Sequence, residues 1–247
     1  MKNKIILFTS FLILLIIVFM PARLISNFIP EKSGITISGL NGTVWSGEIN
    51  NLQVKGWSLS NISFDTHFFP LITGTFGAEV DILKGDITGH TIFQMKNSKN
   101  GELKDTNILT KLSQFEKYIP FKDVELKGEL ETKQLALNIV ESKPVYIIGN
   151  TIWNNGAVVF NGMSWELGDF EINWQTSEDG TIQGNILKRE NVLEIQGNII
   201  ISKQGFLEFN GSISTRVDKS IFNAFLFFAD GKPSNGRQGL KFKKKVW

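Results

Sequence analysis

Three copies of one six-residue pattern follow one another in the second half of the chain: Thr181-Ile-Gln-Gly-Asn-Ile186, Glu194-Ile-Gln-Gly-Asn-Ile199 and Glu208-Phe-Asn-Gly-Ser-Ile213. In each copy, apolar and polar residues alternate, and this period of two is typical of a strand with one buried face. The copies begin 13 and 14 residues apart, which suits successive arms of an antiparallel meander. We therefore predict three consecutive antiparallel strands.

The same alternation extends toward the N-terminus. It appears at Ile35/Ile37, Leu52/Val54, Ile62/Phe64, Val80/Ile82, Leu135/Leu137/Ile139 and Phe170/Ile172/Trp174. Turn-forming residues separate these segments, at Asn41-Gly42, Asn154-Asn155-Gly156, Asn161-Gly162, Asp179-Gly180 and Gln204-Gly205. The sequence predicts a mainly β fold: a curled antiparallel sheet over residues 30–247 with one or two short helices.

The central glycines of the repeats fall in phase with the apolar residues. They are Gly184, Gly197, Gly211 and, in an earlier echo of the pattern, Gly128. Glycine weakens a strand and packs against nothing, so its repeated use on an inner face indicates a sharply curled sheet or a close approach by another group. Two interpretations remain open: a curled sheet could enclose an apolar trough for an acyl chain, or large side chains such as Trp153 and Trp165 could fill the space.

Two segments show helical rather than strand periodicity. Apolar residues make one stripe over Thr106–Tyr118, continuing to Ile119 before Pro120, and a second segment covers Asp218–Asp230 before Gly231. We predict helices there that cover the core, with docking surfaces as the alternative.

The N-terminal segment is apolar. Lys2 and Lys4 precede an uncharged run, Ile5–Met20, and Phe28 and Ile29 extend the apolar exit. About 20 such residues in a helix span a hydrocarbon core of ~30 Å. The run is long for a signal peptide, and no Ala-x-Ala-like cleavage site follows it, so we predict an uncleaved membrane anchor over residues 1–29.

Charge predicts the orientation of this anchor. Two lysines and the terminal amine precede the apolar run, and the long part after it translocates largely regardless of its own charge. We expect a cytoplasmic N-terminus and a periplasmic β domain over residues 30–247, in the inner membrane of a Gram-negative cell.

The C-terminal segment 232–247 is basic. Its cations are Lys232, Arg237, Lys241, Lys243, Lys244 and Lys245, with no acid among them, which leaves the rest of the chain mildly acidic. The mildly acidic body gives no electrostatic footprint for nucleic acid. The tail is expected to be a solvated, frayed end, or else to touch anionic lipid or an acidic partner.

The chain contains few residues suited to catalysis. It has no cysteine and only two histidines, His67 and His90, neither of which lies in a metal-ligand pattern. The phosphate-binding loop Gly-x-x-x-x-Gly-Lys-Ser/Thr and the Gly-x-Ser-x-Gly elbow do not occur. We expect no enzyme activity, no catalytic residues, no metal site and no cofactor.

A motif follows the apolar segment closely. Residues 39–47 read Gly-Leu-Asn-Gly-Thr-Val-Trp-Ser-Gly. They contain the pattern Gly-x-x-Gly-Thr-x-Trp-x-Gly, whose defined positions are Gly39, Gly42, Thr43, Trp45 and Gly47. Asn41-Gly42 favours a tight turn, and Gly47 allows a bulge. Trp45, on the next strand, is expected to point into the core. This block after a single N-terminal apolar segment resembles protein N of the bacterial type II secretion system (general secretion pathway protein N).

Looser similarities to that family continue in order along nearly the whole chain: Phe64, Pro70, Leu71, Ile72 and Gly74; then Pro144, Gly149 and Trp153; then Trp165 and Gly168; and finally Ala229-Asp230-Gly231. Departures include Phe where the second block of the family has Trp, and the lysine-rich end.

The resemblance implies a non-enzymatic component of the inner-membrane platform that exports folded proteins from the periplasm across the outer membrane. Its expected partners are other platform proteins of that system, and membrane lipid through the anchor, with no nucleic acid. The alternative is a lipid-binding or transport protein similar to the AsmA-type envelope proteins, with an apolar β trough.

Overall fold

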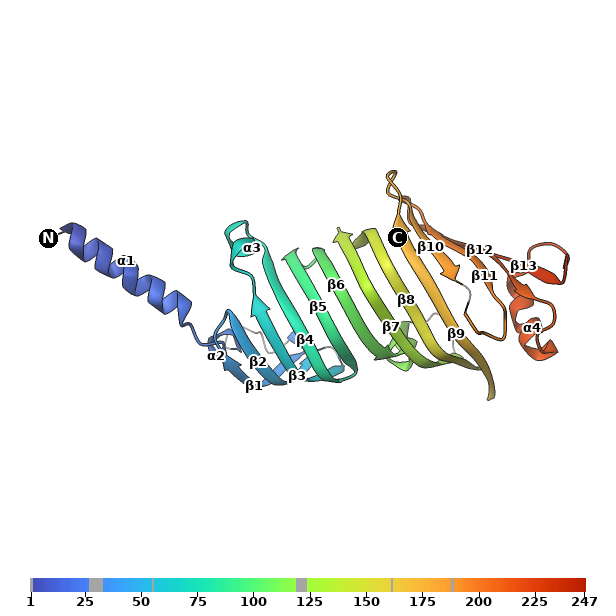
Figure 1. The fold of residues 1–247 in the computed structure, drawn as a ribbon, viewed down its shortest axis with the longest axis horizontal. Coiled ribbons are helices and arrows are strands. Elements are labelled where there is room, and N and C mark those ends of the chain that lie inside the picture. The colour runs from blue at the N-terminus through green and yellow to red at the C-terminus, as the bar shows by residue number, and fades with distance from the viewer. Residues whose placement is uncertain (1, 27–32, 55, 119–123, 161, 188) are drawn as a thin grey trace. The chain divides into compact units, whose positions relative to one another are not determined.

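The structure is a computed structural model that describes residues 2–26, 33–54, 56–118, 124–160, 162–187 and 189–247. The chain forms two compact units, unit 1 over Met1–Lys96 and unit 2 over Asn97–Trp247. Within each unit, every strand is antiparallel to the next strand along the chain, which makes a meander (Figure 1). The predicted mainly β, antiparallel fold with few helices is confirmed.

The described residues of unit 1 form two helices and then five strands, with a further short helix between the third and fourth strands. The helices are α1 (Lys2–Val18), α2 (Arg23–Ser26) and the short α3 (Phe68–Ile72). The strands are β1 (Ile35–Gly42), β2 (Ser46–Val54), β3 (Trp57–Thr66), β4 (Phe76–Gly85) and β5 (Ile87–Asn97). The alternating segments predicted near residues 35, 52, 62 and 80 lie in β1 to β4.

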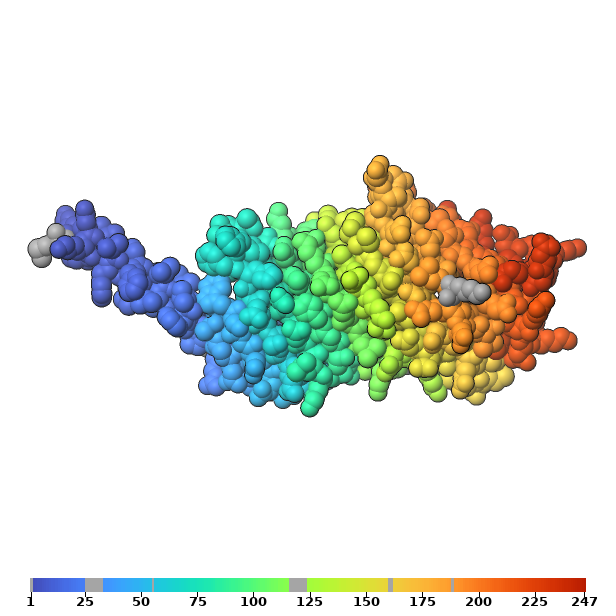
Figure 2. All heavy atoms as spheres, viewed as in Figure 1, coloured from blue at the N-terminus to red at the C-terminus, as the bar shows by residue number. Residues whose placement is uncertain are grey.

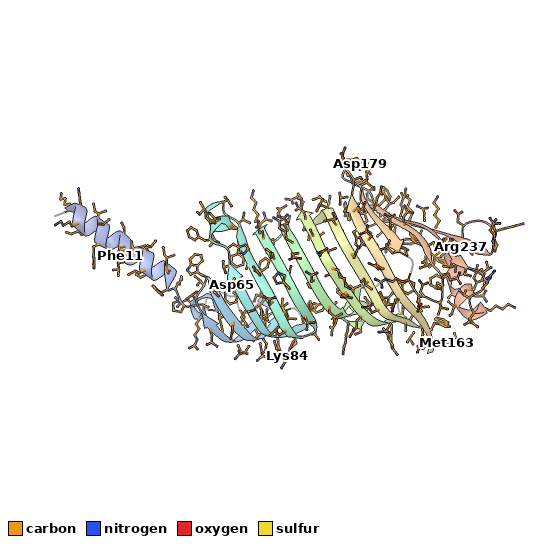
Figure 3. The ribbon with its side chains drawn as sticks, viewed as in Figure 1. Phe11, Asp65, Lys84, Met163, Asp179 and Arg237 are labelled. Carbon is orange, nitrogen blue, oxygen red and sulfur yellow. The ribbon has the colours of Figure 1, made fainter. Side chains whose placement is uncertain are left out.

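Helix α1 is apolar on all sides and has no buried residue. Its side chains stand clear of the strands of unit 1 on the face seen in Figure 2, and Figure 3 labels Phe11 among them. Over the described residues, no helix has both the length and the hydropathy needed to cross a membrane, so the anchor remains a prediction. Phe28 and Ile29, which the predicted anchor includes, lie outside the described residues.

The described residues of unit 2 form eight strands. They are β6 (Asn100–Lys111), β7 (Val124–Val140), β8 (Lys143–Phe160), β9 (Met163–Thr176), β10 (Ile182–Leu187), β11 (Gln196–Ile201), β12 (Phe206–Ser214) and β13 (Arg237–Lys245). The helical segments are the 3-10 helix η2 (Leu112–Tyr118), α4 (Lys219–Phe225) and the 3-10 helix η3 (Leu226–Phe228). The three sequence repeats are β10, β11 and β12, as predicted.

The main hydrophobic core of unit 2 lies between the C-terminal strands and α4. Its buried members are Leu167, Leu193, Ile213, Ile221 and Leu240. Ile213 is completely inaccessible to solvent. Helix α4 lies within the helix predicted over 218–230; Asp218 caps its N-terminus by accepting a hydrogen bond from the Ser220 backbone N–H at 2.8 Å. This helix covers the core, as expected.

The other predicted helix is wrong over its first half. Residues 106–111 belong to strand β6, and only Leu112–Tyr118 are helical. Thr106 and Thr110 are buried, Ile108 is half-buried between them, and Leu109 is exposed. The β-branched residues Thr106, Ile108 and Thr110 lie two apart along the strand, and β-branching favours this extended conformation. Ile119 and Pro120 lie outside the described residues.

One predicted turn is also wrong. Asn154, Asn155 and Gly156 lie inside β8, where the register with β9 shifts between Trp153 and Gly156. Asn155 takes a positive φ of 50° and its backbone N–H donates to the Asp169 carboxylate at 2.8 Å. Asparagine tolerates this left-handed conformation, so the same residues that favour turns make a bulge within a long strand here.

The basic tail is not a frayed end. Its residues from Arg237 to Lys245 form β13, which pairs with β12 over nine residue positions. Lys243 forms an ion pair with Glu208 at 2.5 Å and lies 4.8 Å from the centre of the Phe206 ring. The tail is therefore part of the sheet, and its lysines project from β13, the last strand of the meander.

Candidate functional site: the exit of helix α1 and the first hairpin

The motif residues Gly39–Gly47 form the first hairpin of unit 1 and its turn. Gly39 and Gly42 lie in β1, Gly47 lies in β2, and Thr43 and Trp45 lie in the connection between them. The Thr43 hydroxyl accepts hydrogen bonds from the backbone N–H groups of Trp45 at 3.3 Å and of Ser46 at 3.2 Å. A threonine that bonds the backbone two and three residues ahead stabilises a turn at this point.

The hairpin leaves no room for a side chain at two of its glycines. Gly42 has a φ of +91°, and a Cβ there would lie 2.5 Å from the Ser46 carbonyl oxygen. A Cβ on Gly47, which pairs with Gly42, would lie 2.3 Å from the Asn41 carbonyl oxygen. Both contacts are with backbone, which cannot move aside cheaply, so the close approach of the two strands requires glycine.

The turn is bonded to the exit of α1. The Val44 N–H donates to the Met20 carbonyl at 2.9 Å, and the Ala22 N–H donates to the Gly42 carbonyl at 3.0 Å. Pro21 and Thr43 form an antiparallel bridge between these two bonds. The chain leaving the helix is thus held as a short extra strand beside the turn, and Ala22 is fully buried beneath it.

Trp45 forms a hydrogen bond to a residue 28 positions earlier in the sequence, within helix α1. Its indole N–H donates to the Ile17 carbonyl at 2.8 Å, and its ring centre lies 5.6 Å from that of Phe68. The last carbonyls of a helix lack the usual partner four residues ahead. The Ile17 carbonyl accepts a long bond from the Met20 N–H at 3.4 Å, and the indole adds a second, shorter one. Trp45 was predicted to point into the core of the sheet; it is half-buried and lies against the helix end instead.

Arg23 completes the junction from the other side. Its guanidinium donates to the Leu40 carbonyl at 3.1 Å and to the Asn41 side-chain oxygen at 3.0 Å. Each hydrogen bond of this kind contributes about 0.5–1.5 kcal/mol net. We call Met20–Arg23 together with Gly39–Gly47 the exit junction. It joins α1 mechanically to the first hairpin, and the motif supplies the backbone clearance and the donors that make this possible.

The glycines of the repeats lie where aromatic rings or backbone come close. A Cβ on Gly184 would meet the Trp174 ring at 2.7 Å, and one on Gly211 would meet the Phe209 ring at 2.6 Å. Gly197 pairs directly with Gly211, and its Cβ would lie 2.4 Å from the Asn210 carbonyl oxygen. The inner face at these positions is occupied by protein atoms.

Gly128 lies at a register shift between β7 and β8. A Cβ there would lie 2.8 Å from the indole nitrogen of Trp153, which donates to the Lys127 carbonyl. Trp153 thus takes the space-filling position that the sequence suggested for it. Trp153 and Trp165 both pack against the core around α4, and Trp165 donates to the Ser220 hydroxyl at 3.1 Å. These contacts favour a filled interior over an open trough at the four glycines.

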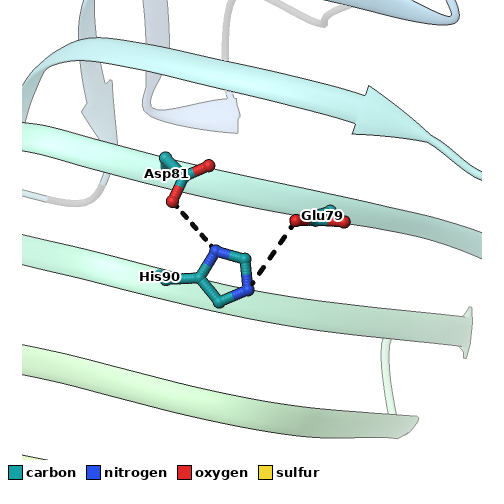
Figure 4. Close-up of side chains that lie close together, drawn as sticks. All are labelled: Glu79, Asp81 and His90. Carbon is teal, nitrogen blue, oxygen red and sulfur yellow. Dashed lines mark hydrogen bonds and ion pairs between the residues drawn. The ribbon is translucent and has the colours of Figure 1, made fainter.

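Sequence reasoning missed a cluster of three ionisable side chains on β4 and β5: Glu79, Asp81 and His90 (Figure 4). His90 Nδ1 lies 2.9 Å from an Asp81 carboxylate oxygen, and Nε2 lies 3.9 Å from a Glu79 carboxylate oxygen. An imidazole with two carboxylates is a donor set that a divalent transition metal accepts. The pairing of Asp81 with His90 across the strands creates the cluster, and only the register, which sequence does not give, could have shown it.

All three side chains of this cluster are partly exposed. The hydrogen bond within the cluster joins His90 Nδ1 to Asp81, whereas Nε2 and Glu79 are too far apart for one. A cross-strand polar pair of this kind stabilises a sheet by roughly 0.2–1 kcal/mol. The geometry therefore supports a structural cross-strand contact without requiring a ligand.

Comparisons with known proteins agree on one family. The family described as Type II secretion system (T2SS), protein N matches residues 33–229. A type II secretion system protein N from Vibrio cholerae serotype O1 is 28% identical over 82 residues, which is 33% of this chain and 32% of that protein. A protein of the same name from Aeromonas hydrophila is 29% identical over 93 residues, 36% of each chain. The aligned part thus spans about a third of the length of these relatives, and no solved structure matches.

Proposed function

Because the chain belongs to the family of type II secretion system protein N, we propose that it is an inner-membrane-anchored component of the secretion apparatus, which supports export of folded proteins from the periplasm across the outer membrane through protein contacts. The observation that carries the proposal is the family match over residues 33–229, which includes the exit junction motif and twelve of the thirteen strands. The proposed role is structural, without catalysis or a cofactor.

The proposed anchor covers residues 1–29, and the properties of α1 support it. No charged side chain occurs from Ile5 to Met20, and exposed apolar side chains surround the helix, among them Leu7, Phe8 and Phe11. A helix that is apolar on every side is stable only where apolar material surrounds it. A bilayer supplies such surroundings, so we place α1 in the inner membrane, with the N-terminus in the cytoplasm and residues 30–247 in the periplasm.

In this proposal, the exit junction connects the membrane anchor to the periplasmic strands. Hydrogen bonds from Trp45, Val44 and Arg23 join the helix end directly to the first hairpin, so that little free chain separates them. A rigid junction would hold the strands of unit 1 close to the membrane, where other inner-membrane platform proteins present their periplasmic parts. The proposed partners are those platform proteins.

The absence of cysteine makes the topology directly testable. Leu83 is 69% exposed near the end of β4, and a single cysteine there should react in intact spheroplasts with a maleimide that cannot cross the inner membrane. A cysteine at Lys4 should react only after the membrane is opened. Protection of the Leu83→Cys variant in intact spheroplasts would contradict the orientation.

Site-specific photo-crosslinking tests the protein contacts. A photoreactive amino acid can replace exposed side chains of unit 2, such as Met163 or Phe227, which are 53% and 87% exposed. We expect crosslinks to other inner-membrane proteins of the secretion system in cells that express it, and none in cells without it. Crosslinks that are the same in both strains would argue against membership of the platform.

A further inference from the structure

Helix α3 presents uncovered apolar side chains. Phe68, Phe69 and Ile72 are 54%, 81% and 69% exposed, and α3 buries none of its residues. Between Asp65 and Glu79 the sequence contains no Asp, Glu, Lys or Arg. A compact group of bare aromatic and aliphatic side chains without flanking charge marks a contact surface, because water does not favour its exposure.

This surface is continuous with the exit of α1. The Phe68 ring lies 5.6 Å from the Trp45 ring and 6.2 Å from the Phe69 ring, measured between centres. Trp45 in turn bonds the carbonyl of Ile17, one residue before α1 ends. Figure 1 shows α3 and the C-terminal end of α1 on the same flank of unit 1. The exposed apolar side chains of α3 therefore lie near the C-terminal end of α1.

Several backbone groups that flank α3 are hydrogen-bonded within the protein. The N–H groups of Thr73 and Thr75 both donate to the Pro70 carbonyl, at 3.1 and 2.8 Å, and the Thr73 hydroxyl donates to the same oxygen at 2.8 Å. The His67 N–H donates to the Gly77 carbonyl at 2.8 Å. Polar backbone groups that are satisfied internally can approach lipid at low cost, whereas open ones cannot.

We propose that Phe68, Phe69 and Ile72 of α3, together with Trp45, insert into the outer interface of the bilayer that holds α1. The inference rests on the proposed anchoring of α1. Tryptophan and other aromatic residues at helix ends concentrate at the membrane–water interface, where an apolar ring meets lipid and a polar edge keeps a hydrogen bond. Trp45 has this arrangement, and α3 provides the neighbouring apolar side chains.

The consequence is a second point of contact with the membrane. A single helix, even one joined rigidly to the first hairpin, can still tilt within the bilayer. A second contact from α3, which connects β3 to β4, would fix the tilt of unit 1 relative to the bilayer. The strands would then stand in one orientation toward their partners.

Spin labels on single cysteines test this in the full chain, reconstituted in vesicles of phosphatidylethanolamine and phosphatidylglycerol. The labelled sites are Ile72 in α3, Phe11 in α1 as the test of the anchor, and Leu83 as the matched control. Ile72 and Leu83 are equally exposed, at 69%, and Leu83 lies near the far end of β4, beside Lys84 in Figure 3. Phe69→Cys provides a second α3 site in case Ile72→Cys disturbs folding.

The readout is the collision rate of each label with oxygen, which concentrates in lipid, and with a nickel chelate, which stays in water. We expect oxygen to dominate at Phe11, Ile72 and Phe69, and the nickel chelate to dominate at Leu83. Labels in α3 that behave like Leu83 while Phe11 stays in lipid would overturn the interfacial contact and leave the anchor intact.

Two further outcomes would also overturn the inference. If the Phe11 label meets the nickel chelate freely, the proposed anchoring fails and the α3 contact falls with it. If the α3 labels are shielded from both reagents, protein covers this surface instead of lipid; spin–spin broadening would then identify a second copy of the chain.

Discussion

At the scale of single residues, the clearest feature is the backbone clearance at Gly42. Its φ of +91° and the nearby Ser46 carbonyl oxygen act against any side chain there. Gly74 in the same unit has a φ of +73° but no atom within 4 Å of a built Cβ. The two positions therefore separate the cost of the dihedral angle from the cost of the close approach.

We predict that Gly42→Ala lowers the free energy of unfolding of unit 1 by about 2–4 kcal/mol, whereas Gly74→Ala costs only the ~1 kcal/mol of the left-handed conformation. Urea unfolding of the purified chain in detergent, followed by hydrogen exchange in β1 and β2, measures both. Equal losses at the two glycines would show that the hairpin tolerates a side chain at Gly42.

Asp218 gives a residue-scale prediction for pH. Hydrogen bonds from the Ser220 hydroxyl and backbone N–H lower the pKa of the Asp218 carboxyl below its ordinary value. A depressed pKa in the folded state means that this cap stabilises α4 fully above the pKa of the unfolded chain, about 3.9, and loses its effect as pH falls through the folded value.

We expect Asp218→Asn to keep the cap, since asparagine is also a good N-cap residue, but to lose this pH dependence. The thermal midpoint of the variant should therefore fall less than that of the wild type when both are taken from pH 7 to about pH 3. Parallel falls in the two proteins would exclude Asp218 as a source of acid sensitivity.

At the scale of elements, β13 is the last strand of the order and carries lysines along its exposed positions. An unpaired strand edge can pair with another chain, and lysine side chains oppose this. Ala229 bridges this strand at Leu240 and Ser234 bridges it at Arg237, and the lysine-rich part from Lys241 to Lys245 lies beyond these bridges. We infer that these lysines hinder pairing with another chain, a role that composition alone does not reveal.

We predict that replacing Lys241, Lys243 and Lys245 by threonine makes the chain associate through β13, visible as larger species in light scattering. The matched control replaces Lys127, Lys133 and Lys143, exposed on the interior strands β7 and β8, and changes the charge equally. Association in the control alone, or in both to the same degree, would attribute the effect to net charge rather than to the edge.

The strands and helices also show how much of the secondary structure could be predicted from the sequence. Alternation identified strands in which one face is more buried than the other, such as β10, where Ile182 and Gly184 are buried and Gln183 and Asn185 are exposed. It failed at Thr106–Lys111, where apolar residues happen to fit both a helical stripe and one face of a strand. It failed again at Asn154–Gly156, because the same residues favour turns and bulges.

The exit junction could be predicted only in part. The motif identified the family and a hairpin, and the positive φ at Gly42 is a local property. The turn itself was misplaced, because Asn41 and Gly42 end β1 and the connection lies at Thr43–Trp45. The bond from Trp45 to the Ile17 carbonyl joins residues 28 positions apart and depends on the direction in which α1 leaves the hairpin. The cluster of Glu79, Asp81 and His90 likewise depends on register, which no local pattern records.

At the scale of the whole molecule, the two units have separate buried residues. Ile62 in unit 1 is 3% exposed, and Ile213 in unit 2 is fully buried. Shortening either isoleucine to alanine leaves a cavity, which costs about 2–5 kcal/mol.

We expect Ile213→Ala to raise hydrogen exchange across β12, β13 and α4 while the exchange of unit 1 stays near that of the wild type. Ile62→Ala should do the reverse, with its effect confined to β2, β3 and β4. Both variants should be compared by mass spectrometry under identical conditions. Uniform acceleration in both units from either change would mean that they unfold as one cooperative body.

The central claim for the whole chain is that it works in type II secretion, and export itself is the most direct test. The measurement is the distribution of a type II substrate between periplasm and medium, in cells that lack this chain and in cells that regain it on a plasmid. We predict that folded substrate accumulates in the periplasm without the chain and returns to the medium with it. Normal export in cells that lack the chain would contradict the account.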